Sequence, residues 1–289
     1  MEATGDAVVV MVTLAVLKRE QLKARLSGRA PEPITLSRYA LHDELGRGAA
    51  GTVYAAHDPT LDRDVAIKVM HTPHLDLIGG VQGRSRLLRE ARALAKLRHP
   101  NIVTIYDVGT VEDGDESGSV FVVMELVDGQ QLDAWVDPSR GWRETLRVVG
   151  GAGRGLAAAH GCGLTHRDFK PANVVVDGDN QARVLDFGLA VAVESTRRDP
   201  QRAPQWVGTP AYMSAEAFAG AEADAASDQF SFCTVLFEAL YGRRPFTGAT
   251  IQQLGLAVQE GVVDRVSDGH GSVKWMPWTA LSRSAVRSR

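Results

Sequence analysis

The sequence has few of the features that would set it apart from ordinary globular proteins. Only two cysteines occur among its 289 residues, Cys162 and Cys233, and they lie far apart without ligand-like spacing. This argues against a disulfide framework or a zinc site, and it suits a reducing, cytoplasmic setting. Internal repeats and low-complexity segments are also absent.

No apolar segment reaches the length that a bilayer requires. The apolar run at residues 7–17 has only eleven residues, and it follows Glu2 and Asp6 rather than the basic region of a signal peptide. We expect a short amphipathic helix there and no membrane span. The net charge of −3 gives no electrostatic reason to bind nucleic acid, so no such partner is expected. The composition leaves the oligomeric state open.

The chain changes character near Gly129. Residues 1–37 read as an extension that ends in a proline-containing stretch. Up to residue 127, β-branched and aromatic segments between turn residues predict strands at 39–45, 52–58, 64–70, 102–108 and 120–126. A helical pattern interrupts them at 84–97, and helices dominate later, most clearly at 144–160 and 228–241. This order predicts a β-rich lobe and a helical lobe with a ligand site between them.

The spacing Gly46-x-Gly48-x-x-Gly51-x-Val53 is the first motif that carries chemistry. By itself it fits a dinucleotide loop, an ATP-covering hairpin or a glycine-rich hairpin without a ligand. A dinucleotide loop leads into a helix, whereas residues 52–54 (Thr-Val-Tyr) favour a continuing strand. The flanks therefore favour a hairpin over the phosphates of ATP, and the hairpin without a ligand stays open for this motif alone.

The second motif is a lysine that ends an apolar strand, Val65-Ala66-Ile67-Lys68. A cation at the edge of a buried surface needs a partner, and Glu90 in the helix at 84–97 is the candidate. Such a Lys–Glu pair orients the phosphates of ATP. A solvated lysine and a surface glutamate are the alternative for these two residues taken alone.

The third motif, His-Arg-Asp-Phe-Lys-Pro-Ala-Asn at residues 166–173, is far more specific. It supplies Asp168 as a carboxylate that can take the proton of an attacking hydroxyl, and Asn173 as an amide ligand for Mg²⁺. A charged surface turn, the alternative, does not explain the apolar residues 174–176 that follow. Thirteen residues after Asn173 comes Asp186-Phe187-Gly188, behind a strand, with a second carboxylate for the metal. The motifs occur together and in order.

From residue 39 to about 248 the chain resembles the eukaryotic-like serine/threonine protein kinases, most closely their bacterial members. The resemblance implies an α+β, bilobal protein-kinase fold with ATP and Mg²⁺ between the lobes. It places an N-lobe at 38–127 and a C-lobe at 128–268, followed by an irregular tail at 269–289. It implies a catalytic set of Asp168, Lys170, Asn173, Lys68 and Glu90 and a metal pair of Asn173 and Asp186. The implied ATP contacts are Gly46, Arg47, Gly48, Gly51, Val53, Ala66, Lys68, Met124, Glu125, Val127 and Val175.

The resemblance also implies roles outside the ATP site. Lys170, two residues after the base, is typical of kinases that act on serine and threonine hydroxyls of proteins, and Thr209 resembles the threonine that binds both residues. Asp228 would anchor the catalytic loop. The side chains of Leu94, His166 and Phe187 would form a packing column between the lobes, although plain core packing explains their apolar character equally well.

Two further expectations concern regulation and the end of the chain. Arg167, next to the base, suggests control by a phosphate on Ser195 or Thr196, with an unmodified polar loop as the alternative. After residue 261 we find no Asp-Pro…Arg pattern of the kind that supplies an arginine to Glu216 in the family. We therefore expect Glu216 to lack that partner or to borrow an arginine from the irregular tail, and residues 228–241 to expose an apolar surface. The alternative function that follows is a kinase-like binding or scaffold domain with an incomplete C-lobe.

Overall fold

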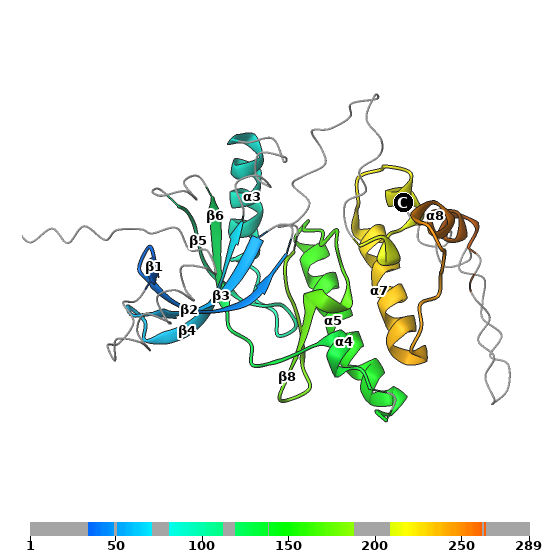
Figure 1. The fold of residues 1–289 in the computed structure, drawn as a ribbon, viewed down its shortest axis with the longest axis horizontal. Helices are drawn as coiled ribbons and strands as arrows, with labels where there is room; N and C mark the ends of the chain where they lie inside the picture. Colours follow the sequence, from blue (N-terminus) through cyan, green and yellow to red (C-terminus); the bar gives the residue numbers. More distant parts are fainter. Residues whose placement is uncertain are drawn as a thin grey trace, which may run out of the picture.

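The structure, a computed structural model, describes residues 34–48, 51–70, 81–111, 119–137, 139–187, 209–261 and 263. The expected helix at 7–17, the candidate phosphorylation sites Ser195 and Thr196, Gly188 and the tail at 269–289 lie outside these residues. The described chain forms a β-rich N-lobe and a mainly helical C-lobe (Figure 1).

A six-stranded antiparallel sheet makes up most of the N-lobe, in the order β1-β2-β3-β4-β6-β5. Buried and partly buried residues alternate along β3, as expected for a strand with one face on the core. The strands are β1 (Ile34–Leu36), β2 (Tyr39–Arg47), β3 (Gly51–Asp58), β4 (Arg63–Met70), β5 (Ile105–Thr110) and β6 (Val120–Glu125). Five of them were predicted, with β5 starting three residues later than expected. β1 was missed, because a three-residue strand carries no readable period.

One helix, α3 (Val81–Leu94), packs against β5 and β6. Its buried side chains Leu87, Ala91 and Leu94 follow the helical spacing and form the face toward the sheet. Arg86 and Glu90 lie on the flank of this buried face and are partly buried, and they make ion pairs with Glu222 and Arg167 of the C-lobe.

The C-lobe is built around two packed helices, α5 (Trp142–Gly161) and α7 (Ala225–Tyr241). Gly155 allows α5 to approach the chain at Asn101, since a Cβ there would lie 2.6 Å from the carbonyl oxygen of Asn101. The smaller helices are α4 (Leu132–Trp135), α6 (Ala215–Phe218), α8 (Ile251–Glu260) and the 3₁₀ turns η1 (Pro171–Asn173) and η2 (Pro210–Tyr212). A second antiparallel sheet joins β7 (Gly129–Gln131), β8 (Val174–Asp177) and β9 (Ala182–Val184).

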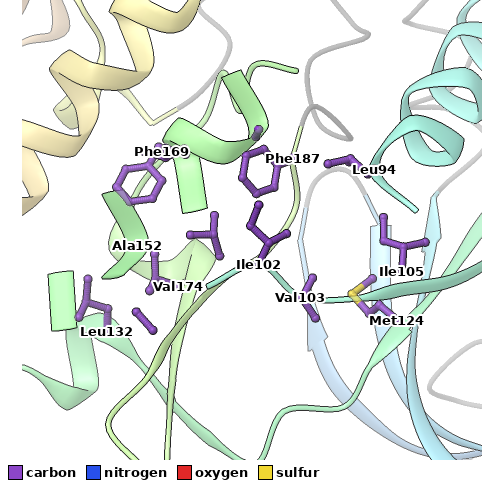
Figure 2. Close-up of a cluster of buried hydrophobic side chains, with 14 of the residues drawn as sticks. Leu94, Ile102, Val103, Ile105, Met124, Leu132, Ala152, Phe169, Val174 and Phe187 are labelled. Carbon is purple, nitrogen blue, oxygen red and sulfur yellow. The ribbon is translucent and has the colours of Figure 1, made fainter. Parts of the chain in front are cut away.

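A continuous apolar core connects the lobes. Figure 2 shows Leu94, Ile105 and Met124 on the N-lobe side and Phe169 and Leu132 on the C-lobe side of one buried cluster. Phe187, Ile102 and Val103 lie between these two groups (Figure 2). The segments that carry the motifs are therefore fixed by packing on both sides.

The expected exposed surface on residues 228–241 is not found in the described part of the chain, where no large apolar side chain of α7 is exposed. The reason is that α7 packs on α5 and η2, and Phe230 stacks on Phe246 with ring centroids 5.7 Å apart. Asp224 caps the start of α7 by accepting hydrogen bonds from the backbone of Ala226 and Ser227. Of the helices described, none is both long and apolar enough to cross a membrane.

Candidate active site

The glycine motif forms the turn between β2 and β3. These strands pair antiparallel, with Gly46 opposite Val53 and Arg47 opposite Thr52. This strand–loop–strand form rules out the dinucleotide loop, which leads into a helix. Gly51 has no room for a side chain, because a Cβ would lie 2.2 Å from the carbonyl oxygen of Val69. In contrast, Gly46 and Gly48 have open space around them.

The residues expected around adenine lie on neighbouring segments. Ala66 on β4 pairs directly with Met124 on β6, and Val53 and Val127 pack against the same core cluster. Val175 lies on β8 of the C-lobe and is partly buried. Within the described part of the chain, the backbone N–H of Val127 makes no hydrogen bond, which leaves a donor of the kind that adenine recognition uses.

Glu125, the last residue of β6, is held through both its backbone and its side chain. Its N–H donates to the carbonyl of Thr104 (2.9 Å), and its carboxylate accepts from the N–H of Thr104 (3.2 Å). The carboxylate also lies 3.5 Å from Nη1 of Arg183 on β9. Because the N–H of Glu125 is already used, any adenine contact at this residue falls to its carbonyl.

The residues expected on the substrate side form a closed hydrogen-bonded group. Nζ of Lys170 lies 2.7 Å from Oδ2 of Asp168 and 2.9 Å from Oγ1 of Thr209. The backbone N–H of Thr209 donates to the other oxygen, Oδ1 of Asp168, at 3.1 Å. The Lys170 side chain and the Thr209 amide thus hold the two oxygens of the Asp168 carboxylate in one orientation, and Thr209 Oγ1 in turn accepts from Lys170.

Asp228, on α7, anchors the loop that carries the expected base, Asp168. Its buried carboxylate accepts hydrogen bonds from the backbone N–H groups of His166 and Arg167, both at 2.7 Å, and lies 2.7 Å from Nε2 of His160. Arg167 and Asp186 have left-handed backbone conformations, with φ of 68° and 58°. Such conformations cost free energy in residues with a side chain and persist where the surroundings enforce them, often at functional sites.

His166 is a fully buried imidazole with both ring nitrogens engaged. Nε2 lies 2.8 Å from the carbonyl oxygen of Leu185, which can only accept, so Nε2 carries the proton. Nδ1 is then the acceptor for the backbone N–H of Asp168, at 3.3 Å. Burial lowers the pKa of His166, against the opposing charge of Asp228, and this keeps the ring neutral. Its ring packs on Phe187 at a centroid distance of 4.9 Å, as the expected column requires.

The residues expected to hold a metal fit that role in donor chemistry. Asn173 donates its side-chain N–H to the carbonyl of Asp168 (2.8 Å), which leaves its amide oxygen as the other polar atom. Asp186 binds Lys68 through Oδ2 alone, and its Oδ1 makes no ion pair among the described residues. Mg²⁺ prefers oxygen ligands of these two kinds, usually completed by phosphate and water. No cluster of three or more His, Cys, Asp or Glu side chains able to hold a metal occurs among the described residues.

The expected ion pair between Lys68 and Glu90 is not formed, and this expectation is corrected. Lys68, whose side chain is 8% exposed, lies 2.7 Å from the carboxylate of Asp186. Glu90 instead pairs with Arg86 at 3.1 Å and with Arg167 at 3.2 Å. Two guanidinium groups with several directed donors compete for Glu90 against one ammonium group, and the buried ammonium is neutralised by the carboxylate nearest to it.

Two ion-pairing residues were missed by the sequence analysis. Arg86 lies one helical turn before Glu90, so the i, i+4 spacing on a helix could have identified it. Glu222, in the connection between α6 and α7, approaches both Arg86 (3.2 Å) and Arg167 (3.6 Å). Nothing in its local sequence indicates these contacts. For Glu216, no ion pair is formed within the part of the chain that the structure describes.

Comparison with known proteins agrees with this geometry. The model of the protein kinase domain family matches residues 39–287. A probable serine/threonine-protein kinase of Streptomyces coelicolor is 38% identical over 214 residues, which is 73% of this chain and 31% of that protein. PknB of Bifidobacterium longum is 36% identical over 229 residues (77% and 33%), and PknB of Mycobacterium leprae is 38% identical over 219 residues (75% and 34%).

The fold and the motifs define a bilobal kinase domain, and the chain belongs to the protein kinase family. The relatives compared are serine/threonine-protein kinases, so the chain is similar to the serine/threonine type. It spans about a third of the length of these curated relatives. The family match passes beyond residue 268, through most of the expected tail, and the domain boundaries given above stay predictions.

Proposed function

We propose that this chain transfers the γ-phosphoryl group of ATP to serine and threonine hydroxyls of proteins. The observation that carries the proposal is the contact of one ammonium group, Lys170 Nζ, with both Asp168 and Thr209. A hydroxyl that approaches Asp168 meets a carboxylate whose orientation is fixed from two sides, and a cation beside it to balance the charge of an incoming phosphate. This arrangement suits a positioned base.

Each residue then has a definite task. Asp168 accepts the hydroxyl proton as the oxygen attacks, and Lys170 balances the charge that builds up beside it. Asn173 and Asp186 would hold Mg²⁺, which supplies charge neutralisation at the phosphates when it is bound. Lys68, which lies next to Asp186, would bind the phosphates of ATP, and Gly46, Arg47, Gly48 and Gly51 would cover them.

The adenine end would lie between the lobes. Val53 and Ala66 would cover one face of the ring and Val175 the other, and Met124 would limit its depth. The N–H of Val127 and the carbonyl of Glu125 would give the hydrogen bonds. A cytoplasmic setting is part of the proposal, and it rests on two free cysteines, Cys162 and Cys233, that suit a reducing compartment.

The test is transfer of label from ATP, with Mg²⁺, to peptides that contain serine, threonine or tyrosine. Asp168→Asn should lower the rate by about 10²–10⁴-fold, because general-base catalysis contributes that much. The matched control is Asp179→Asn, a carboxylate in the exposed turn between β8 and β9, which should leave the rate unchanged. Equal rates for the parent and Asp168→Asn would exclude the assigned base.

The alternative, a scaffold domain without activity, is not favoured. Every residue of the motif set is present, and the catalytic loop is tied to α7 through Asp228. A parent chain that bound ATP but transferred no label, even after treatment with an active kinase, would restore the scaffold alternative.

A further inference from the structure

Four charged side chains meet where α3 faces the C-lobe: Arg86 and Glu90 of α3, Arg167 of the catalytic loop, and Glu222 of the α6–α7 connection. One oxygen of Glu90, Oε1, receives both Arg86 Nε (3.1 Å) and Arg167 Nη1 (3.2 Å). One oxygen of Glu222, Oε1, receives Arg86 Nη2 (3.2 Å) and lies 3.6 Å from Arg167 Nη2. Positive and negative groups thus alternate in a neutral ring, which we call the ion ring.

The ion ring connects the lobes at the expense of another contact. In the structure Glu90 pairs with Arg167 and not with Lys68, which is bound to Asp186 instead. The ring therefore belongs to a state in which the helix glutamate is held away from the ATP-side lysine.

Glu222 has a specific part in this state. Without it, one carboxylate would face two guanidinium groups, and the group would carry an uncompensated positive charge. The carboxylate of Glu222 neutralises the second arginine and so lets Arg86 and Arg167 close on Glu90 together. Its side chain is 65% exposed, against 14% for Arg167 and 19% for Glu90, so it is the member that can be exchanged with the least damage to the fold.

We propose that Glu222 is an autoinhibitory positioning residue that holds Glu90 of α3 away from Lys68 through the ion ring. The proposal rests on the proposed kinase function, since it describes the regulation of the same site. Release of Glu222 separates Arg86 from Arg167, lets α3 move, and frees Glu90 to reach Lys68. Because the ring is partly exposed, higher salt should favour release as well.

The first test measures the position of α3 and needs no activity. Spin labels are placed on exposed positions of the two lobes, Arg92→Cys on α3 and Ala157→Cys on α5, after replacement of the native Cys162 and Cys233. We expect the parent to give one dominant distance and Glu222→Lys to give a second population. Glu222→Gln should give a smaller amount of the same population, because it removes the attraction without adding repulsion.

The second test measures transfer. Glu222→Lys and Arg86→Met should raise the initial rate, by about twofold to tenfold, which is the range expected for the loss of one or two partly exposed ion pairs. The matched control is Glu260→Lys, the same charge change at the exposed end of α8, which should change neither the distances nor the rate.

The outcomes separate this proposal from the proposed function. Distances that respond to Glu222→Lys but not to Glu260→Lys support the ion ring, whether or not the parent transfers phosphate. Distances in Glu222→Lys and Arg86→Met that equal those of the parent at both low and high salt overturn it, even if transfer is normal. Loss of transfer in every chain, including the parent, would instead count against the proposed function.

Discussion

The two sides of the candidate site differ in how completely they are assembled. On the substrate side, Asp168, Lys170 and Thr209 are joined by hydrogen bonds. Asp228 of α7 holds the loop that carries Asp168 by accepting from its backbone N–H groups. On the ATP side, Glu90 of α3 pairs with Arg86 and Arg167 and not with Lys68. The difference follows from the elements involved. The substrate-side groups lie on segments packed within the C-lobe, whereas Lys68 and Glu90, both in the N-lobe, meet only if α3 brings Glu90 close to β4.

This comparison shows that the presence of every motif residue does not ensure that every expected contact, such as the Lys68–Glu90 ion pair, is formed. Local hydrogen bonds within a lobe form with the fold itself. An ion pair that depends on the position of a helix competes with the other charged groups that the helix can reach. In this structure Glu90 pairs with Arg86 and Arg167. The same residues can therefore support activity in one arrangement and restrain it in another.

The largest effect is expected where the two sides meet, at Asp186. Asp186→Asn should lower transfer by at least about 10²-fold, because the metal ligand is lost. It should also lower the free energy of unfolding by about 1–3 kcal/mol, because Lys68 would keep its buried charge without a carboxylate. The matched control is Asp43→Asn, an exposed carboxylate on β2. Transfer at the parent rate in Asp186→Asn would show that the metal assignment is wrong.

The contribution of Asp228 to the stability of the fold can be tested by removing its carboxylate. Asp228→Ala leaves two buried N–H groups without an acceptor and should cost about 2–5 kcal/mol, measured by denaturant unfolding. Asp224→Ala removes only the cap of the same helix and should cost about 1 kcal/mol. Equal costs for the two variants would mean that the carboxylate of Asp228 does not anchor the loop.

How much of this could be predicted from the sequence depends on the range of the interaction. The strands around Ala66 and the base at Asp168 follow from local pattern and motif, and the group at Thr209 followed from the resemblance. The short strand Ile34–Leu36 and helix α8 were missed, because neither has enough periodic residues to stand out. The partner of Glu90 could not be predicted, because it depends on which charged side chains of other elements the fold brings within reach of it.

Removal of Lys170 should lower the transfer rate less than removal of a metal ligand does. Lys170→Met keeps the length of the side chain but removes the contacts to Asp168 and Thr209. Transfer should fall by about tenfold to a hundredfold, because the base loses part of its orientation while its carboxylate stays. The maximum rate should fall more than the Michaelis constant for ATP changes. A change confined to the ATP constant would place Lys170 on the ATP side instead.

The smallest effect concerns the dependence of stability on pH, through His166. Burial lowers the pKa of this histidine, whereas in the unfolded chain it titrates near its ordinary value of about 6.5. Below that pH the unfolded chain binds a proton that the folded chain does not, so the free energy of unfolding falls as the pH drops from about 7 toward the lowered pKa. The slope from this group approaches about 1.4 kcal/mol per pH unit. In His166→Gln, an amide can still donate to Leu185 and accept from Asp168 without titrating. The unfolding free energy of His166→Gln, measured in urea between about pH 7 and 5, should therefore fall less steeply than that of the parent. Equal slopes of unfolding free energy against pH in the two proteins would show that the neutral, buried imidazole does not control stability in this pH range.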